Sequence, residues 1–174
     1  MAPFKEDFAW STQFIPAIKQ IVGPRLLVPA SLELDTKEAT DLIIFMARDM
    51  RIAARMRSVG YEEKYPYDFT IRSRRDSGSE TELSKIMSGW GDWFFYGHDG
   101  GNSKISHWRI FDLNVFRRSH HMHEIGLETI KWVVHPNKDV NGNRDGTWFR
   151  AYDALSFPRG LVIASSRWIE DIAA

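Results

Sequence analysis

The sequence predicts a mixed α/β domain in which a central mixed β-sheet is flanked by helices. Three observations carry this prediction: an apolar run of strand length at residues 42–47, alternating segments at residues 50–57 and 68–74, and helical spacing of apolar residues at residues 4–22. Strands interspersed with helices are typical of a sheet that has helices packed against it. We expect one domain over residues 1–174, because that length buries a sizeable core.

The composition limits the kinds of function. Lys plus Arg and Asp plus Glu are both 23, so the formal net charge is zero and nucleic-acid binding would need a local basic patch. The chain has no cysteine, which excludes disulfides, thiolate zinc sites and cysteine nucleophiles. Its longest apolar run, "LIIFMA", is far too short to span a membrane. We therefore expect a cytoplasmic protein without a membrane partner.

The N-terminal third should contain one helix and three strands. Pro16 interrupts the apolar stripe of residues 4–22, which predicts a kink or two short helices. "RLLV" and "SLEL" follow as short strands. "DLIIFMA", which begins at Asp41, is a continuous apolar run of the kind found in strands buried on both faces.

The next segments should be two arginine-bearing strands and a helix. In residues 50–57 arginines alternate with apolar residues, and residues 68–74 alternate again, so each strand is expected to be half buried. Ser79 followed by Glu82 predicts a capping box at the start of a helix. The apolar face of that helix is expected to consist of Leu83, Ile86, Met87 and Trp90.

The C-terminal half should add more strands and one helix. "DWFFYG" is expected to be a buried aromatic segment, "ISHWRIFDL" a strand, "NVFRRSHHMHE" a short helix and "GLVIAS" a last strand. "PNKDVNGNRDG" contains Asn-Gly and Asp-Gly pairs, which favour a hairpin turn between "TIKWVVH" and "TWFRAYD".

Charged residues cluster in the region of the first strands. Acidic side chains gather between residues 33 and 41: Glu33, Asp35, Glu38 and Asp41. Residues 48–75 carry eight basic and four acidic side chains, a local excess of four positive charges. We expect the strand led by Asp41 to lie next to an arginine-bearing strand, with a row of guanidinium groups beside the carboxylate. Carboxylates hold Mg²⁺ and arginines bind phosphate, so this arrangement fits metal-assisted phosphodiester cleavage. It also fits a solvated sheet face whose arginines pair with nearby acids.

Two resemblances bear on function. The order of an N-terminal helix, a strand led by Asp41, an arginine-bearing strand and a following helix, in the first half of the chain, resembles the PD-(D/E)XK nuclease-like superfamily. The stretch "EATDLIIFMARDMRIAARMR" is part of this pattern. This stretch, "DFTIRSRRDSGSETELSKIMSGWGDWFFYGH" and "NRDGTWFRAYDALSFPRGLVIASS" also look like small uncharacterised phage and prophage proteins. The second resemblance covers nearly the whole chain and implies an origin in a phage, hence the cytoplasm of a host cell.

The superfamily resemblance implies a set of catalytic residues. Asp41 stands at the metal-binding aspartate position, with Mg²⁺ or Mn²⁺ as the metal. Arg55 or Arg57 stands at the position of the family's lysine, but Ala53 or Arg55 then occupies the acid position. The second metal carboxylate would therefore come from elsewhere, with four candidates: Glu33, Asp35, Glu80 and Glu82.

The segment "TIRSRRDSGSETE" has two interpretations. Arg72 and Arg74 share one face of the predicted strand, and Glu80 and Glu82 begin the next helix. They form either a phosphate clamp beside a metal carboxylate or a structural ion-pair network.

Three weaker motifs favour structural roles. "SHHMHE" offers His120, His121 and His123 for a transition metal, but a surface histidine cluster is the favoured interpretation. "NGNRDG" lacks the glutamate of a calcium loop and is interpreted as a hairpin turn. In "GWGDWFFYGHDGG" the aromatic run is expected in the core, and His98 with Asp99 is kept as a weak site candidate.

Two functions follow from these observations. The first is a phage-encoded PD-(D/E)XK-like protein that acts on DNA as a divalent-metal-dependent nuclease. The second is a non-catalytic interaction protein that retains the fold and binds a host or phage protein, for example as an inhibitor of host defence.

Overall fold

A four-stranded mixed sheet forms the centre of the molecule. The computed structural model describes residues 9–23, 27–29, 42–44, 50–138 and 142–167. The strand order is β3–β5–β6–β9, and the bounds are Ile52–Arg57, Trp93–Asp99, Ile105–Asp112 and Val162–Ser165. β3 runs parallel to β5 whereas the other pairs are antiparallel, so the predicted mixed sheet is confirmed.

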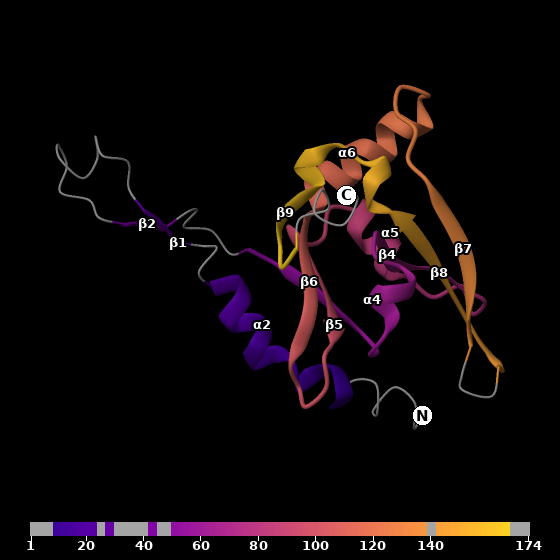
Figure 1. The fold of residues 1–174 in the computed structure, drawn as a ribbon. Helices are drawn as coiled ribbons and strands as arrows, with labels where there is room; N and C mark the ends of the chain where they lie inside the picture. The colour runs from indigo at the N-terminus through magenta and orange to yellow at the C-terminus, as the bar shows by residue number, and fades with distance from the viewer. Residues whose placement is uncertain (1–8, 24–26, 30–41, 45–49, 139–141, 168–174) are drawn as a thin grey trace.

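A second, antiparallel sheet packs beside the first. Its order is β4–β8–β7, with bounds Asp68–Arg75, Arg144–Asp153 and Trp132–Lys138. The predicted hairpin is confirmed, because β7 and β8 pair antiparallel and extend as a long arm at one side of the molecule (Figure 1). The ladder between β4 and β8 shifts register between Arg72 and Arg74, which separates these two arginines.

The strand that follows Asp41 does not pair as expected. β2 (Leu42–Ile44) pairs antiparallel with β1 (Leu27–Pro29) in a separate two-stranded sheet. In the pairings that the structure describes, the only neighbour of β3 is β5. The expectation that β2 lies beside the arginine-bearing strand in one central sheet is therefore wrong for the described residues. Asp41 itself lies outside them.

A helix covers one face of the central sheet. Residues 9–12 are helical and α2 (Ile15–Val22) begins one residue before Pro16, so the predicted interruption near the proline is confirmed. Phe14, Ile18 and Val22 pack against Met56 and Phe95 of the sheet. Figure 1 shows α2 beside β5 and β6, on the side away from α5 and α6.

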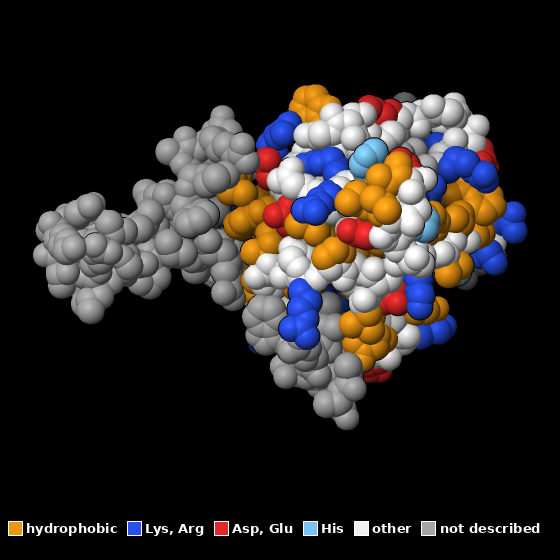
Figure 2. Space-filling view, turned by 90° about the horizontal axis from the view of Figure 1, so that it is seen from above, with side chains coloured by type: hydrophobic (Ala, Val, Ile, Leu, Met, Phe, Trp, Pro, Cys, Tyr) orange, Lys and Arg blue, Asp and Glu red, His pale blue; other side chains and the backbone are white. Residues whose placement is uncertain are grey.

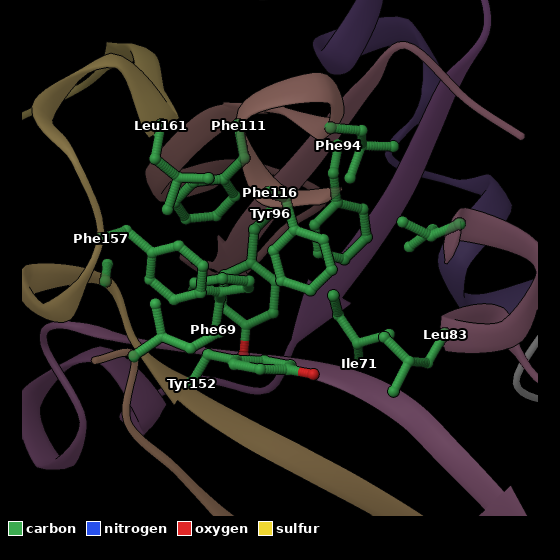
Figure 3. Close-up of a cluster of buried hydrophobic side chains, with 14 residues drawn as sticks. Phe69, Ile71, Leu83, Phe94, Tyr96, Phe111, Phe116, Tyr152, Phe157 and Leu161 are labelled. Carbon is green, nitrogen blue, oxygen red and sulfur yellow. The ribbon is translucent and has the colours of Figure 1, made fainter. Parts of the chain in front are cut away.

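The other face of the central sheet carries the main core. Aromatic rings from both sheets and from α6 (Leu113–Glu124) converge there (Figure 3). Phe69 lies 4.3 Å from Phe111 and 5.3 Å from Tyr152, measured between ring centroids. Phe94 and Phe95 are fully buried on opposite faces of β5, which confirms the predicted aromatic core segment. Two 3-10 turns close the cluster: η2 (Ala154–Ser156) and η3 (Arg159–Leu161).

The helix after β4 begins two residues later than the predicted capping box. In α5 (Glu82–Met87) Thr81 is the N-cap: its Oγ1 accepts from the Ser84 amide at 3.2 Å, and Ser84 Oγ accepts from the Thr81 amide at 2.9 Å. The predicted cap of Ser79 with Glu82 is therefore wrong. Because Ser84 completes the box, the Glu82 carboxylate is left to interact with the neighbouring strands.

Candidate nucleic-acid interface

A pocket of about 290 Å³ opens beside α5. It lies where β3, β4 and the turn after α5 meet, and we call it the α5 pocket. Its charged and aromatic lining comprises Arg72, Arg75, Glu80, Glu82, Lys85 and Trp90. Three cations and two carboxylates therefore face one hollow next to an indole ring.

Arg72 and Arg75 give the α5 pocket its positive charge. The described residues hold no carboxylate within ion-pair distance of either guanidinium, and the Nε atoms of both are buried without a hydrogen-bond partner there. The Arg72 guanidinium carbon lies 5.8 Å from the centre of the Phe149 ring. An aromatic face holds a guanidinium in place without neutralising its charge, so Arg72 remains able to bind an anion.

Glu82 joins the two arginine-bearing strands. Its Oε2 accepts from Arg55 Nη2 at 2.5 Å and from the Arg72 backbone amide at 3.0 Å. Arg55 also lies over Phe149, at 4.9 Å from the ring centre. Burial lowers the pKa of Arg55, and the Glu82 carboxylate opposes that change. The predicted ion pairs of Arg72 and Arg74 with the acids of the next helix are wrong for the described residues: Glu82 pairs with Arg55 of β3 in a largely buried ion pair, Arg74 pairs with Asp76, and Arg72 reaches Glu82 only through its backbone amide.

Trp90 is an exposed aromatic side chain at the rim of the pocket. It is 60% exposed, so its prediction as part of the buried face of α5 is wrong, whereas Leu83 and Ile86 are buried as expected. Arg117 Nη1 donates to the carbonyls of Ile86 and Gly91, each at 3.2 Å, which fixes the turn that carries the indole. The guanidinium of Arg51 lies 5.3 Å from the Trp90 ring centre.

Arginine stacked on aromatic rings recurs across the described part of the chain. Seven arginines lie over a ring: Arg51, Arg55, Arg57, Arg72, Arg74, Arg144 and Arg150. A ring face attracts a guanidinium and holds it in place, so these contacts order the arginine side chains. Basic and acidic side chains are nevertheless mixed on the face shown in Figure 2, in keeping with the zero net charge. Any positive field is therefore local.

Five further residues were predicted to bind metal or phosphate: Glu33, Asp35, Asp41, Arg74 and Glu80. Glu33, Asp35 and Asp41 lie outside the described residues. Glu80 faces Lys85 at 3.9 Å. Arg74 lies over Trp148 and 3.6 Å from Asp76, so it does not line the α5 pocket with Arg72. No group of three metal-ligating side chains converges within the described ranges, and the Mg²⁺ or Mn²⁺ site stays a prediction.

One histidine of the α6 cluster is part of the core, and another is exposed. His120 is buried, with its Nε2 2.9 Å from the hydroxyl of Tyr152, so its expected place on the surface is wrong. His121 is exposed as expected, and His123 Nδ1 lies 3.1 Å from the Glu128 carbonyl oxygen.

Sequence reasoning missed the two most distinctive pocket residues, Trp90 and Arg75. A signal was present for the indole, because Trp90 stands between Gly89 and Gly91, both of which adopt positive φ. A tryptophan inside such a turn lies beyond the last helical turn and cannot share the helix's apolar face.

The described residues contain no helix long and apolar enough to cross a lipid bilayer. In comparisons with protein-family models, curated proteins and solved structures, the chain has no match.

Proposed function

We propose that the protein binds the phosphate backbone of nucleic acid at the α5 pocket, with Trp90 stacking on an unpaired base. The observation that carries the proposal is the pair Arg72 and Arg75. Within the described residues no carboxylate lies at ion-pair distance from either guanidinium, and both arginines line the pocket beside an exposed indole on a fixed turn. Guanidinium groups bind phosphate oxygens in a bidentate way, and every base can stack on an aromatic ring. This combination favours single-stranded nucleic acid, or strand ends, over an intact duplex.

The test is the affinity of labelled single-stranded DNA and RNA, measured by fluorescence anisotropy over a range of salt concentrations. We expect the double variant Arg72→Met/Arg75→Met to weaken binding at least tenfold. It should also reduce the slope of log K against log salt by about 1.4, since each phosphate contact to a single strand contributes about 0.7. Trp90→Ala should weaken binding at least fivefold and leave that slope unchanged, because stacking releases no counterions.

The matched control is Lys104→Met/Lys138→Met, which removes two exposed charges in the β5–β6 turn and at the end of β7. It should bind within a factor of two of the native chain. An equal loss of affinity in both double variants would mean that binding depends only on the overall charge, and it would contradict the proposed binding at the α5 pocket. If the native chain binds no nucleic acid at low salt, the second sequence-based function, an interaction protein with a host or phage partner, becomes the better hypothesis.

A metal-dependent nuclease is the second candidate, and one observation favours it. Glu80 and Glu82, two of the predicted metal carboxylates, line the same pocket as Arg72. In this hypothesis Asp41 supplies the further carboxylate and the arginines stabilise charge on the phosphate. We expect digestion of plasmid and branched DNA with Mg²⁺ or Mn²⁺ by the native chain and none by Asp41→Asn. Equal digestion by both, or none by either, contradicts the nuclease hypothesis and leaves binding intact.

A further inference from the structure

A second cluster of polar groups lies under α4 (Tyr61–Lys64), at the end of β3 away from the α5 pocket. It consists of Arg57, Glu62, His98 and Arg109, and we call it the α4 cluster. The β-ladders bring its strand residues together: Arg57 pairs in register with His98, and Arg109 pairs with Tyr96. In Figure 1 α4 lies next to the lower end of β3, to the right of β5 and β6.

Three contacts hold α4 and the turn after it over the α4 cluster. The Arg57 guanidinium lies 4.1 Å from the centre of the Tyr61 ring. Ser106 Oγ donates to Glu62 Oε1 at 3.0 Å, and Arg109 Nη2 donates to the Pro66 carbonyl. α4 and the turn that follows it therefore shield the cluster from solvent.

Arg109 is a buried cation that lacks a paired acid. Its side chain belongs to a residue only 4% exposed, no carboxylate of the described residues lies within ion-pair distance, and its Nε has no hydrogen-bond partner there. Burial lowers the pKa of Arg109, opposed by Tyr96, Tyr67 and Asp68. A buried charge without a partner is strongly unfavourable, so this site calls for a counter-anion.

The other members of the cluster add unsatisfied groups around the same point. His98 is 4% exposed, and among the described residues neither of its buried ring nitrogens has a hydrogen-bond partner, nor has the buried Nε of Arg57. Ser106 Oγ donates to Glu62 Oε1 at 3.0 Å and lies 3.3 Å from the His98 carbonyl oxygen, so Glu62 lies close to this strand. The charges of Glu62, Arg109, His107 and Arg57 all act on the pKa of His98. The cluster thus offers two guanidinium N–H groups and, in a neutral imidazole, one further N–H donor and one acceptor.

Glu62 determines which hydrogen-bonding groups a ligand of this cluster must have. Its Oε1 accepts from Ser106, whereas its Oε2 is buried and has no hydrogen-bond partner in the described part of the chain. As a carboxylate oxygen, Oε2 can only accept a hydrogen bond. Two arginines and one glutamate leave these four side chains with one net positive charge when His98 is neutral. Asp68 also acts on the pKa of Arg109, but it does not lie within ion-pair distance of the guanidinium. The complementary ligand is therefore an anion that accepts several hydrogen bonds and donates one of its own.

We propose that the α4 cluster is a binding site for a small protonated oxyanion of the phosphate class. Mono- or dihydrogen phosphate has acceptor oxygens for Arg57, Arg109 and the imidazole N–H, and a hydroxyl for Glu62 Oε2. Sulfate at neutral pH has no hydroxyl, so it would place two acceptors against each other at Glu62. The site is separate from the α5 pocket, whose lining includes none of these four residues.

The experiment titrates phosphate-depleted protein with sodium phosphate, sulfate or chloride at equal ionic strength and pH 7, by calorimetry and by the shift in melting temperature. We expect one phosphate per chain and a preference over sulfate of at least tenfold. Arg109→Met should abolish phosphate binding, because it replaces the buried cation with an apolar chain of similar length. Arg72→Met/Arg75→Met should bind phosphate as the native chain does, although the proposed nucleic-acid binding of this variant is impaired.

Glu62→Gln provides the sharpest variant, because α4 contributes no buried residue to the core and the fold should survive the change. The amide can donate to sulfate, so the preference for phosphate should fall to less than threefold. Equal effects of phosphate and sulfate on the native chain would overturn the proposal. So would phosphate binding that persists in Arg109→Met, or that is lost in Arg72→Met/Arg75→Met.

Discussion

Replacing Glu82 with alanine should lower the free energy of unfolding by about 3–5 kcal/mol, the range for breaking one partner of a buried ion pair. The Arg55 and Glu82 side chains are 14% and 23% exposed, and Oε2 of Glu82 receives both the Arg55 guanidinium and the Arg72 amide. Alanine would leave a buried cation and a buried N–H without their acceptor. Urea unfolding followed by circular dichroism measures the change.

Two control variants separate charge from packing. Glu80→Ala, at an exposed position with only a 3.9 Å pair to Lys85, should change the free energy of unfolding by less than about 0.5 kcal/mol. Arg55→Met/Glu82→Leu removes both charges while keeping apolar volume, so it should recover more than half of the loss. If the Glu82→Ala variant is as stable as the native chain, the prediction that the Arg55–Glu82 ion pair stabilises the fold is wrong. The same variant is a poor probe of metal binding, because its instability would lower any activity.

The alternation of side-chain types along the sequence predicted most of the strands, because the two faces of each strand pack against different parts of the molecule. β3 alternates because Ile52 and Met56 pack toward α2, while Ala53 packs in the main core. The hairpin between β7 and β8 was predictable because Asn-Gly and Asp-Gly pairs suit tight turns. The cap of α5 was not, since two overlapping patterns, Ser79 with Glu82 and Thr81 with Ser84, both fit a helix start. The Ser79 pattern needs the Glu82 carboxylate to cap the helix, but in the structure that carboxylate binds Arg55, which is 27 residues away in the sequence.

The sites depend on contacts between residues far apart in sequence, which local patterns do not report. The arginines of β3 were expected either beside a metal carboxylate or on a solvated face, yet Phe149 of β8 covers Arg55. His120 was expected on the surface because its neighbours are polar, but Tyr152 and Trp132 from the second sheet enclose its ring. The role of Arg109 could not be seen in "SHWRIFDL". No carboxylate of the described residues lies within ion-pair distance of its guanidinium, and that depends on residues far away in the sequence.

The two buried histidines should make the protein sensitive to mild acid. Burial lowers the pKa of His98 and of His120 to about 4, from an ordinary value of about 6.5. Between these values the unfolded chain binds protons that the native state excludes, so the free energy of unfolding falls as the pH falls from about 6.5 to about 4. Below about 4 both states bind the protons and the contribution levels off. Each histidine contributes up to about 3 kcal/mol.

The contribution of one histidine can be isolated with His120→Gln, measured by urea unfolding at several pH values in phosphate-free buffer. Its stability should fall less steeply between pH 6.5 and 4 than that of the native chain, with the difference approaching 2–3 kcal/mol on the same scale. His121→Gln, at an exposed position on the same helix, should follow the native curve. Burial beside Asp153 raises the pKa of Asp68, which strengthens the fold as the pH falls and opposes the histidines. Because Asp68 is present in every variant, only the difference between the curves reports on His120, and parallel curves would contradict a neutral buried imidazole.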